Sequence, residues 1–314
     1  MTMKSSVVEI ARLYYEHGKN QDDIACEYGI SRSTVSRLLK EARDSGIVRF
    51  QIIDPNSVCT QIAARLEAKF NLKNAVVIEG DSDSVDVIKR DIGVAGASLF
   101  SRLIRGNQTI GIFWGSTIYE LVRNLVPKDV EGVKVVQMVG TLGNMLSDTH
   151  ADQLARLIAT NYDGEWHILF APAVVESNDS AKTFLKEPHI GQVLEIGKES
   201  DIALIGVGLC NDDALLARAG YLTSAEIRHL RSLGAVGEVG CRFFTADGQP
   251  CSSDIDHRTI SIELEDLRKI PTKIGLAGGL KKVDAIHGAL VGNYINVLVT
   301  DIKTATALLE QRVS

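Results

Sequence analysis

Short runs of Val, Ile and Leu recur between residues 74 and 300, and a stretch with helical periodicity follows most of them. The runs cover residues 74–78, 108–113, 133–139, 165–170, 201–207, 272–277 and 297–300. Strands that are apolar on both faces need helices on both sides, which is typical of a buried parallel sheet. The pattern therefore predicts an α/β fold with an open, doubly wound, Rossmann-like parallel sheet, and leaves its strand order undetermined.

Helices are expected before, between and after these strands. Apolar residues at helical spacing define them, and Asp301 stands at the N-cap position of the last one. The predicted helices cover residues 61–70, 85–104, 118–125, 152–160, 190–199, 283–290 and 304–311.

Residues 1–50 carry a different pattern, with three helical segments separated by glycine turns. Apolar residues recur at helical spacing over residues 7–14 and again over 21–28, and a third segment begins after Ser31, a residue suited to an N-cap. Gly18 and Gly29 are expected to end the first two segments. A helix, a short helix, a tight turn and a helix rich in Ser, Thr and Arg are typical of a helix-turn-helix motif.

The third segment has the side chains expected of a DNA recognition helix. Short hydroxyls allow close approach to DNA, and arginine can bond a guanine edge or a phosphate. The predicted DNA-contacting residues are Ser31, Arg32, Ser33, Thr34, Ser36, Arg37 and Lys40. The alternative is a small helical bundle with a solvated polar helix. Residues 1–50 hold eight basic and seven acidic side chains, so the placement of cations on one helix, rather than total charge, favours DNA binding.

Charge and composition limit the remaining possibilities. The 314-residue chain has a net charge of −6 and a pI of about 5.7, so any DNA-binding surface must be local. Five cysteines without a CxxC pair argue against a thiolate metal site or a disulfide framework. With no apolar run of ~18 residues and no signal peptide, we expect a cytoplasmic protein without a membrane partner.

The expected domain boundary is a polar break at residues 54–57. Residues 46–52, just before it, are predicted to form a strand or wing that leaves the first domain.

Small and hydroxylic residues follow several of the predicted strands. Ligands of open α/β sheets bind at the carboxyl ends of the strands, where glycines let a phosphate approach backbone N–H groups. The candidate ligand-binding residues of this type are Ser116, Thr117, Gly140, Thr141, Gly208, Gly278 and Gly279. Each alone could be a tight turn between strand and helix. No GxGxxG or Walker motif is present, so the pattern implies neither a dinucleotide nor ATP.

Two charged residues join this candidate site. Glu238 lies in an apolar, glycine-rich stretch, where a carboxylate is expected to bind sugar hydroxyls or to cap a nearby backbone. Lys282 follows Gly278 and Gly279 at the start of a helix, where a lysine is disfavoured unless it meets an anion. Solvent exposure is the alternative for Lys282, and Lys281 could take its place. No metal-binding spacing and no Ser/His/Asp arrangement is readable, so we expect no metal, no cofactor and no catalytic residues.

The order of motifs resembles the SorC family of bacterial sugar-responsive transcriptional regulators. The helix-turn-helix with its following strand carries the resemblance, together with residues 111–115, 201–208, 234–238, 274–279 and 292–301. The match runs in order across nearly the full chain.

The resemblance implies a DNA-binding domain at residues 1–54 and a sugar-phosphate-sensing and oligomerisation domain at 55–314. The latter is expected to resemble sugar-phosphate isomerases, and the assembly to be a homo-oligomer of tetramer size. The expected partners are operator DNA and a phosphorylated sugar or polyol.

The resemblance also assigns roles to individual residues. Glu238 matches an acidic residue that contacts the effector, and Lys282 matches a lysine that follows paired glycines. Residues Gly140–Asn144 match a phosphate-binding loop. Where Thr141 stands a second glycine is common, and where Val139 stands some members carry a lysine, so a Schiff base is not expected. The alternatives are an active isomerase or deaminase fused to a DNA-binding module, or a constitutive architectural DNA binder.

Overall fold

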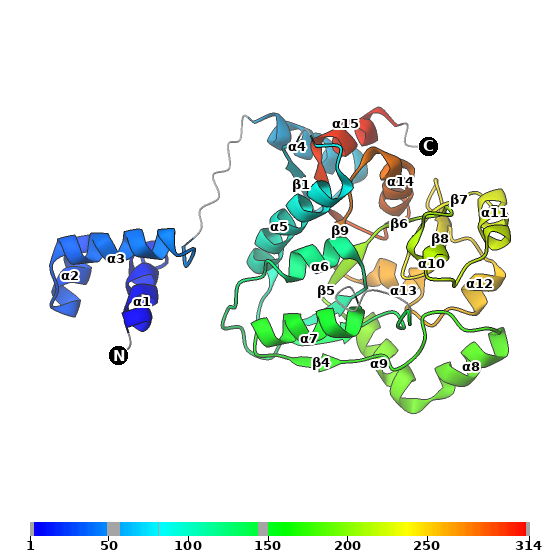
Figure 1. Ribbon diagram of the computed structural model, residues 1–314, viewed down its shortest axis with the longest axis horizontal. Coiled ribbons are helices and arrows are strands. Elements are labelled where there is room, and N and C mark those ends of the chain that lie inside the picture. The colour runs from blue at the N-terminus through cyan, green and yellow to red at the C-terminus, as the bar shows by residue number, and fades with distance from the viewer. Residues whose placement is uncertain (1–2, 49–56, 81, 144–149, 312–314) are drawn as a thin grey trace. The chain divides into compact units, whose positions relative to one another are not determined.

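The chain divides into two compact units, Met1–Pro55 and Asn56–Ser314, in a computed structural model that describes residues 3–48, 57–80, 82–143 and 150–311 (Figure 1). The predicted wing falls mostly outside these residues. Its first part, residues 46–48, forms a turn and a bend.

The N-terminal unit consists, in its described part, of α1 (Met3–Tyr15), α2 (Gln21–Tyr28) and α3 (Arg32–Asp44). Their inward sides form a separate small core, made of Val7, Ile10, Ala11, Ile24, Ala25, Val35, Leu38, Leu39 and Ala42. The caps follow from the sequence. Gly29 ends α2 with a left-handed backbone (φ 62°), and the Ser31 side chain accepts a hydrogen bond from the Thr34 amide at the start of α3. Both predicted caps are confirmed.

The C-terminal unit is built on one parallel sheet of seven strands. These are β1 (Asn74–Ile78), β2 (Thr109–Ile112), β3 (Lys134–Gln137), β4 (Glu165–His167), β5 (Ile202–Gly206), β9 (Thr272–Leu276) and β10 (Val297–Asp301). Their order across the sheet is β1-β10-β9-β5-β2-β3-β4. The seven predicted strands therefore all form, within a few residues of the expected bounds.

Helices lie on both faces of this sheet, as a doubly wound fold requires (Figure 1). The helices that accompany it are α4 (Val58–Phe70), α5 (Val85–Leu103), α6 (Ser116–Val122), α7 (Ala151–Asn161), α9 (Pro188–Lys198), α14 (Val283–Val291) and α15 (Ile302–Glu310). Because strand connections are right-handed, α5, α6 and α7 cover one face, and α9 and α14, which lead in the opposite direction, cover the other.

The strand order contains one topological switch point. From β2 the chain proceeds through β3 to β4 at one edge, whereas from β5 it proceeds through β9 to β10 in the other direction. The neighbouring strands β2 and β5 pair with Ile112 opposite Leu204. A crevice at the carboxyl ends of such a strand pair is the usual ligand site of this architecture.

A second, antiparallel sheet was not expected from the sequence. It has three strands, β6 (Gly208–Leu209), β7 (Ala235–Val239) and β8 (Arg242–Thr245), in the order β6-β7-β8. The helices that the sequence did not predict are α8 (Asn178–Lys186), α10 (Leu215–Arg218), α11 (Ser224–Ser232), α12 (Asp254–His257), α13 (Leu264–Lys269) and the 3-10 helix η2 (Leu280–Lys282). The buried Arg242 joins this sheet to the following segment, with guanidinium nitrogens 2.7 Å from Asp256 and 2.6 Å from Glu263.

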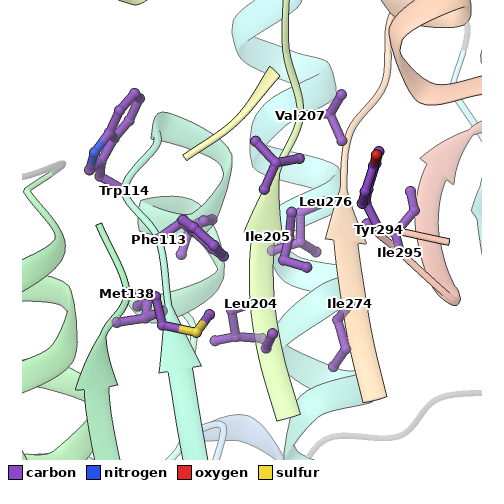
Figure 2. Close-up of a cluster of buried hydrophobic side chains, with 14 of the residues drawn as sticks. Phe113, Trp114, Met138, Leu204, Ile205, Val207, Ile274, Leu276, Tyr294 and Ile295 are labelled. Atoms are coloured by element: carbon purple, nitrogen blue, oxygen red, sulfur yellow. The ribbon is translucent and has the colours of Figure 1, made fainter. Parts of the chain in front are cut away.

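The apolar core of the C-terminal unit extends along the strands of the large sheet and includes residues just beyond their carboxyl ends. Figure 2 shows Leu204, Ile274 and Met138 at one level, and Trp114 and Val207 beyond the strand ends. Among the described residues, no helix is both long and apolar enough to cross a bilayer.

Candidate DNA-reading helix and ligand site

Helix α3, the predicted recognition helix, has one buried and one exposed face. Val35, Leu38, Leu39 and Ala42 pack into the small core. Ser33, Ser36, Arg37 and Lys40 are exposed and follow the i, i+3, i+4, i+7 spacing of a single stripe. Four of the seven predicted DNA-contacting residues are thus presented together to solvent.

The other three predicted residues lie at the start of α3. The Ser31 hydroxyl is 2.8 Å from both the Ser33 and the Thr34 hydroxyls, so Ser31 and Thr34 serve first as the cap of the helix. The exposed Arg32 lies 3.7 Å from Asp22 of α2. This surface pair is weak and leaves the guanidinium free to exchange its partner for a phosphate.

In the C-terminal unit, Gly208 and Glu238 lie directly opposite each other. They are register partners of β6 and β7, and Gly208 comes two residues after the end of β5. A methyl group on residue 208 would lie 1.8 Å from Glu238 Oε1, so only glycine leaves room for the carboxylate here. The other oxygen, Oε2, accepts a hydrogen bond from the Cys241 amide at 2.9 Å. Oε1 has no hydrogen-bond donor among the described residues, so one oxygen is anchored and the other is available.

Lys282, the last residue of η2 and the N-cap residue of α14, reaches the same place. Its ammonium donates a hydrogen bond to the Val207 carbonyl at 2.6 Å, one residue before Gly208. Helix α14 is brought close by Gly237, since a methyl there would lie 2.6 Å from the Ala285 Cβ. An ammonium has three N–H donors, so two remain for a ligand. Gly208, Glu238 and Lys282 are therefore brought together, although up to 74 positions separate them in the chain.

The environment disfavours the charge of both groups. Burial raises the pKa of Glu238 to about 7, although the Cys241 amide and the nearby Lys282 oppose the shift. Burial also lowers the pKa of Lys282, with Lys89 adding to the effect and Glu238 opposing it. A ligand that offers hydroxyl donors to the carboxylate and an anion to the ammonium would stabilise both charged forms.

The paired glycines have a structural role that the sequence did not reveal. The Gly279 amide donates to Asp301 Oδ2 and to Thr304 Oγ1, both at 2.8 Å, so it is not free to bind a phosphate. A methyl on Gly278 would lie 2.4 Å from Asp301 Oδ2. Asp301 also caps α15 through the Thr304 amide, as predicted. The cap of the last helix thus holds the loop that leads to Lys282.

The predicted phosphate loop also differs from the expectation of free amides. The amides of Gly140, Thr141 and Gly143 donate to Ile260 O, Ala171 O and Tyr221 Oη at 2.9, 2.8 and 2.7 Å. Thr141 also forms an isolated bridge with Pro172. All three acceptors lie at least 30 positions away in the chain, so the sequence does not reveal them. Asn144 lies outside the described residues.

Ser116 and Thr117 begin α6 directly after β2, at the switch point. Ser116 is exposed and Thr117 is buried. Gly115 precedes them with φ 151° and offers no side-chain cap, so the first-turn amides of α6 have no side-chain acceptor. Among the described residues, no group of three His, Cys, Asp or Glu side chains is placed to hold a metal ion.

Comparison with known proteins agrees with this architecture. Residues 54–310 match the family described as "Putative sugar-binding domain", and residues 9–45 match sigma-70 region 4. The deoxyribonucleoside regulator of Bacillus subtilis is 38% identical over 302 residues, which cover 96% of each chain. The chain belongs to the SorC family of sugar-binding transcriptional regulators.

Further relatives of this SorC-family protein carry names of the same kind. The sorbitol operon regulator of Klebsiella pneumoniae is 33% identical over 310 residues, covering 97% of each chain. The crystal structure of the full-length sorbitol operon regulator from that organism superimposes with a TM-score of 0.79 at 32% identity, covering 98% of this chain and 99% of that one. These relatives are named as regulators rather than enzymes. This SorC-family chain is thus a transcriptional regulator with a helix-turn-helix region and a sugar-binding domain.

Proposed function

We propose that the C-terminal unit binds a phosphorylated sugar or polyol at the switch point, and that this binding changes the affinity of α3 for operator DNA. The proposal rests mainly on one observation. An anchored carboxylate with a free oxygen, Glu238, and an ammonium with unused donors, Lys282, converge beside Gly208 at the strand ends.

The chemistry of this pair matches the two ends of a sugar phosphate. Glu238 Oε1 accepts hydrogen bonds from ring or chain hydroxyls, and Lys282 Nζ contacts an anionic oxygen. The exposed Ser116 hydroxyl, beside the uncapped start of α6, is available to a phosphate as well. Asp301 and Thr304 act on the site through the Gly279 loop, as positioning residues.

On the DNA side, Ser33, Ser36, Arg37 and Lys40 contact the major groove, and Arg32 contacts a phosphate beside it. A half-site read by one helix requires a second copy for the other, so the protein acts as a homo-oligomer, of tetramer size by family resemblance. The ligand must bind one arrangement of the subunits better than another, because equal affinity for both would shift nothing. A coupling of about 1–3 kcal/mol changes operator affinity about 5- to 150-fold.

A thermal-shift screen of the full chain tests the ligand part of this proposal. The relatives are named for deoxyribonucleosides and for sorbitol, so the panel contains 2-deoxyribose 5-phosphate, ribose 5-phosphate, sorbitol 6-phosphate, the three unphosphorylated parents and inorganic phosphate. A member of the panel is expected to raise Tm, with the phosphorylated form more effective than its parent.

Two neighbouring lysines provide a matched pair of variants. Lys282→Ala is expected to abolish the Tm shift, whereas Lys281→Ala, which removes an exposed cation one position away, is expected to retain it. Glu238→Gln is expected to weaken the shift. A normal response from both Lys282→Ala and Glu238→Gln would show that the ligand binds elsewhere.

A further inference from the structure

Lys89, on α5, lies beside the proposed ligand site and was not singled out in the sequence. Two isoleucines that flank it in the helix hold α5 against the loop that leads to Lys282. An ideal Cβ on Gly278 would lie 2.6 Å from Ile92 Cδ1 and 3.2 Å from Ile88 Cγ2. Lys89 is therefore within one helical turn of the contact between α5 and this loop.

The packing of α5 on α6 brings Lys89 to the level of Ser116. Helix α5 joins β1 to β2 and α6 joins β2 to β3, so both run from the carboxyl ends of the parallel strands toward their amino ends (Figure 1). A methyl group on Gly93 would lie 2.4 Å from Glu120 Cβ, so the two helices touch at these positions. Lys89 and Ser116 each lie four residues earlier, which is one turn nearer the carboxyl ends of the strands.

The charge of Lys89 has a weak partner and a repulsive neighbour. Its side chain is 31% exposed, and its ammonium lies 3.8 Å from Asp86, whose side chain is 94% exposed. Such a surface pair contributes little. Burial lowers the pKa of Lys282, the charge of Lys89 lowers it further, and Glu238 opposes both effects. Two ammonium groups are thus close to one buried carboxylate, an excess of positive charge that an anion would neutralise.

From this placement we propose that the Lys89 ammonium contacts the phosphate group of the bound sugar phosphate or polyol phosphate, together with Lys282. A phosphate monoester has three acceptor oxygens and about two negative charges near pH 7, so it can bind two ammonium groups at once. Long side chains on a helix point toward its N-terminus, which for α5 is the side of the strand ends. Lys89 thereby favours phosphorylated over unphosphorylated ligands. The inference rests on the proposed function and adds one specificity-determining residue to it.

Matched substitutions on α5 test this contact. Lys89→Met keeps the apolar stem and removes the charge, whereas Arg90→Met removes a charge at the next position, which is exposed and pairs with Asp91. The full chain is titrated calorimetrically with the phosphorylated panel compound that raises Tm most. Lys89→Met is expected to bind about tenfold more weakly, the loss of one charge-assisted hydrogen bond. Arg90→Met should bind as wild type does, and Lys89→Arg should recover part of the affinity.

The unphosphorylated parent compound distinguishes a contact with phosphate from a structural role. At high concentration it should change the Tm of wild type and of Lys89→Met to the same extent, because it carries no phosphate. Equal affinities of wild type and Lys89→Met for the phosphorylated compound would overturn the assignment. A loss of the parent's Tm shift as large as the loss of the phosphorylated compound's shift would overturn it as well.

The two proposals fail in different ways. If no phosphorylated panel compound binds wild type, the proposed function is wrong and the role of Lys89 falls with it. If binding is lost in Lys282→Ala and unchanged in Lys89→Met, only the role of Lys89 is wrong.

Discussion

The buried carboxyl group of Glu238 makes a prediction about stability that needs no knowledge of the ligand. It is 7% exposed, and its pKa is raised from an ordinary value of 4.5 to about 7. The substitution Glu238→Gln keeps the size and shape of the side chain and removes the titration. The two proteins should therefore differ in how their free energy of unfolding depends on pH.

The sign follows from proton binding. Because the folded state holds this proton more tightly than the unfolded state, the stabilising effect is complete below pH 4.5 and is lost as the pH rises through 7. The shift corresponds to about 3 kcal/mol in total, of which about 2 kcal/mol falls between pH 5.0 and 7.5. Relative to Glu238→Gln, wild type should lose that amount across this interval.

Urea unfolding of the full chain, followed by circular dichroism at half-unit pH steps, measures the difference. The transition of the larger C-terminal unit is the one to compare, and ΔG is extrapolated linearly to zero denaturant. The interval stops at pH 7.5 because removing Glu238 also removes the carboxylate that raises the pKa of Lys282. Glu187→Gln, at an exposed position, controls for the loss of one negative charge.

Parallel stability curves for wild type and Glu238→Gln would refute this reasoning. They would show that the carboxyl group is solvated or paired in solution, so that burial does not set its protonation. The same result would also count against the proposed ligand site, because a solvated Glu238 would not have one oxygen held by a backbone amide and the other left for a ligand.

Three further substitutions test other parts of the molecule. Arg37→Ala should weaken operator binding by about 1–3 kcal/mol in a fluorescence anisotropy titration while the ligand-induced Tm shift persists; unchanged affinity would remove Arg37 from the interface. Gly208→Ala puts a methyl 1.8 Å from Glu238 Oε1, so calorimetry should detect no ligand binding, and wild-type affinity would contradict the site. Thr304→Val leaves the Gly279 amide without one of its acceptors and should lower the free energy of unfolding by about 1–3 kcal/mol, whereas Thr304→Ser should not.

Much of the secondary structure could be predicted because its signals are local. The α2–α3 turn is encoded by Gly29 and Ser31, whose roles as cap residues depend only on adjacent amides. The strands of the large sheet are runs of apolar residues, and because such strands are apolar on both faces, they must be covered by helices on both sides. By contrast, β6 has only two residues, Gly208 and Leu209, and Gly237 interrupts the apolar residues of β7, so the small sheet has no clear signal in the sequence.

The candidate site was predicted only in part. The sequence singles out Glu238, Gly208 and Lys282 separately, and the structure brings them together. The free amides expected at Gly140, Thr141 and Gly279 are engaged, because their acceptors come from Ile260, Ala171, Asp301 and Thr304, which lie far away in the chain. Tyr221, whose hydroxyl accepts a hydrogen bond from the Gly143 amide, has no readable signal in the sequence, since a single aromatic residue does not reveal a partner 78 positions away.

The sequence by itself determined the types of element, the exposed stripe of α3 and the family to which the chain belongs, because these depend on spacings of a few residues and on motif order. Only the tertiary structure decided which strand ends are neighbours, and hence that a carboxylate on β7 and an ammonium at the start of α14 meet beside a glycine after β5. The physical reason is that strand order and helix packing arise from burial summed over the whole unit, which no single stretch of sequence records.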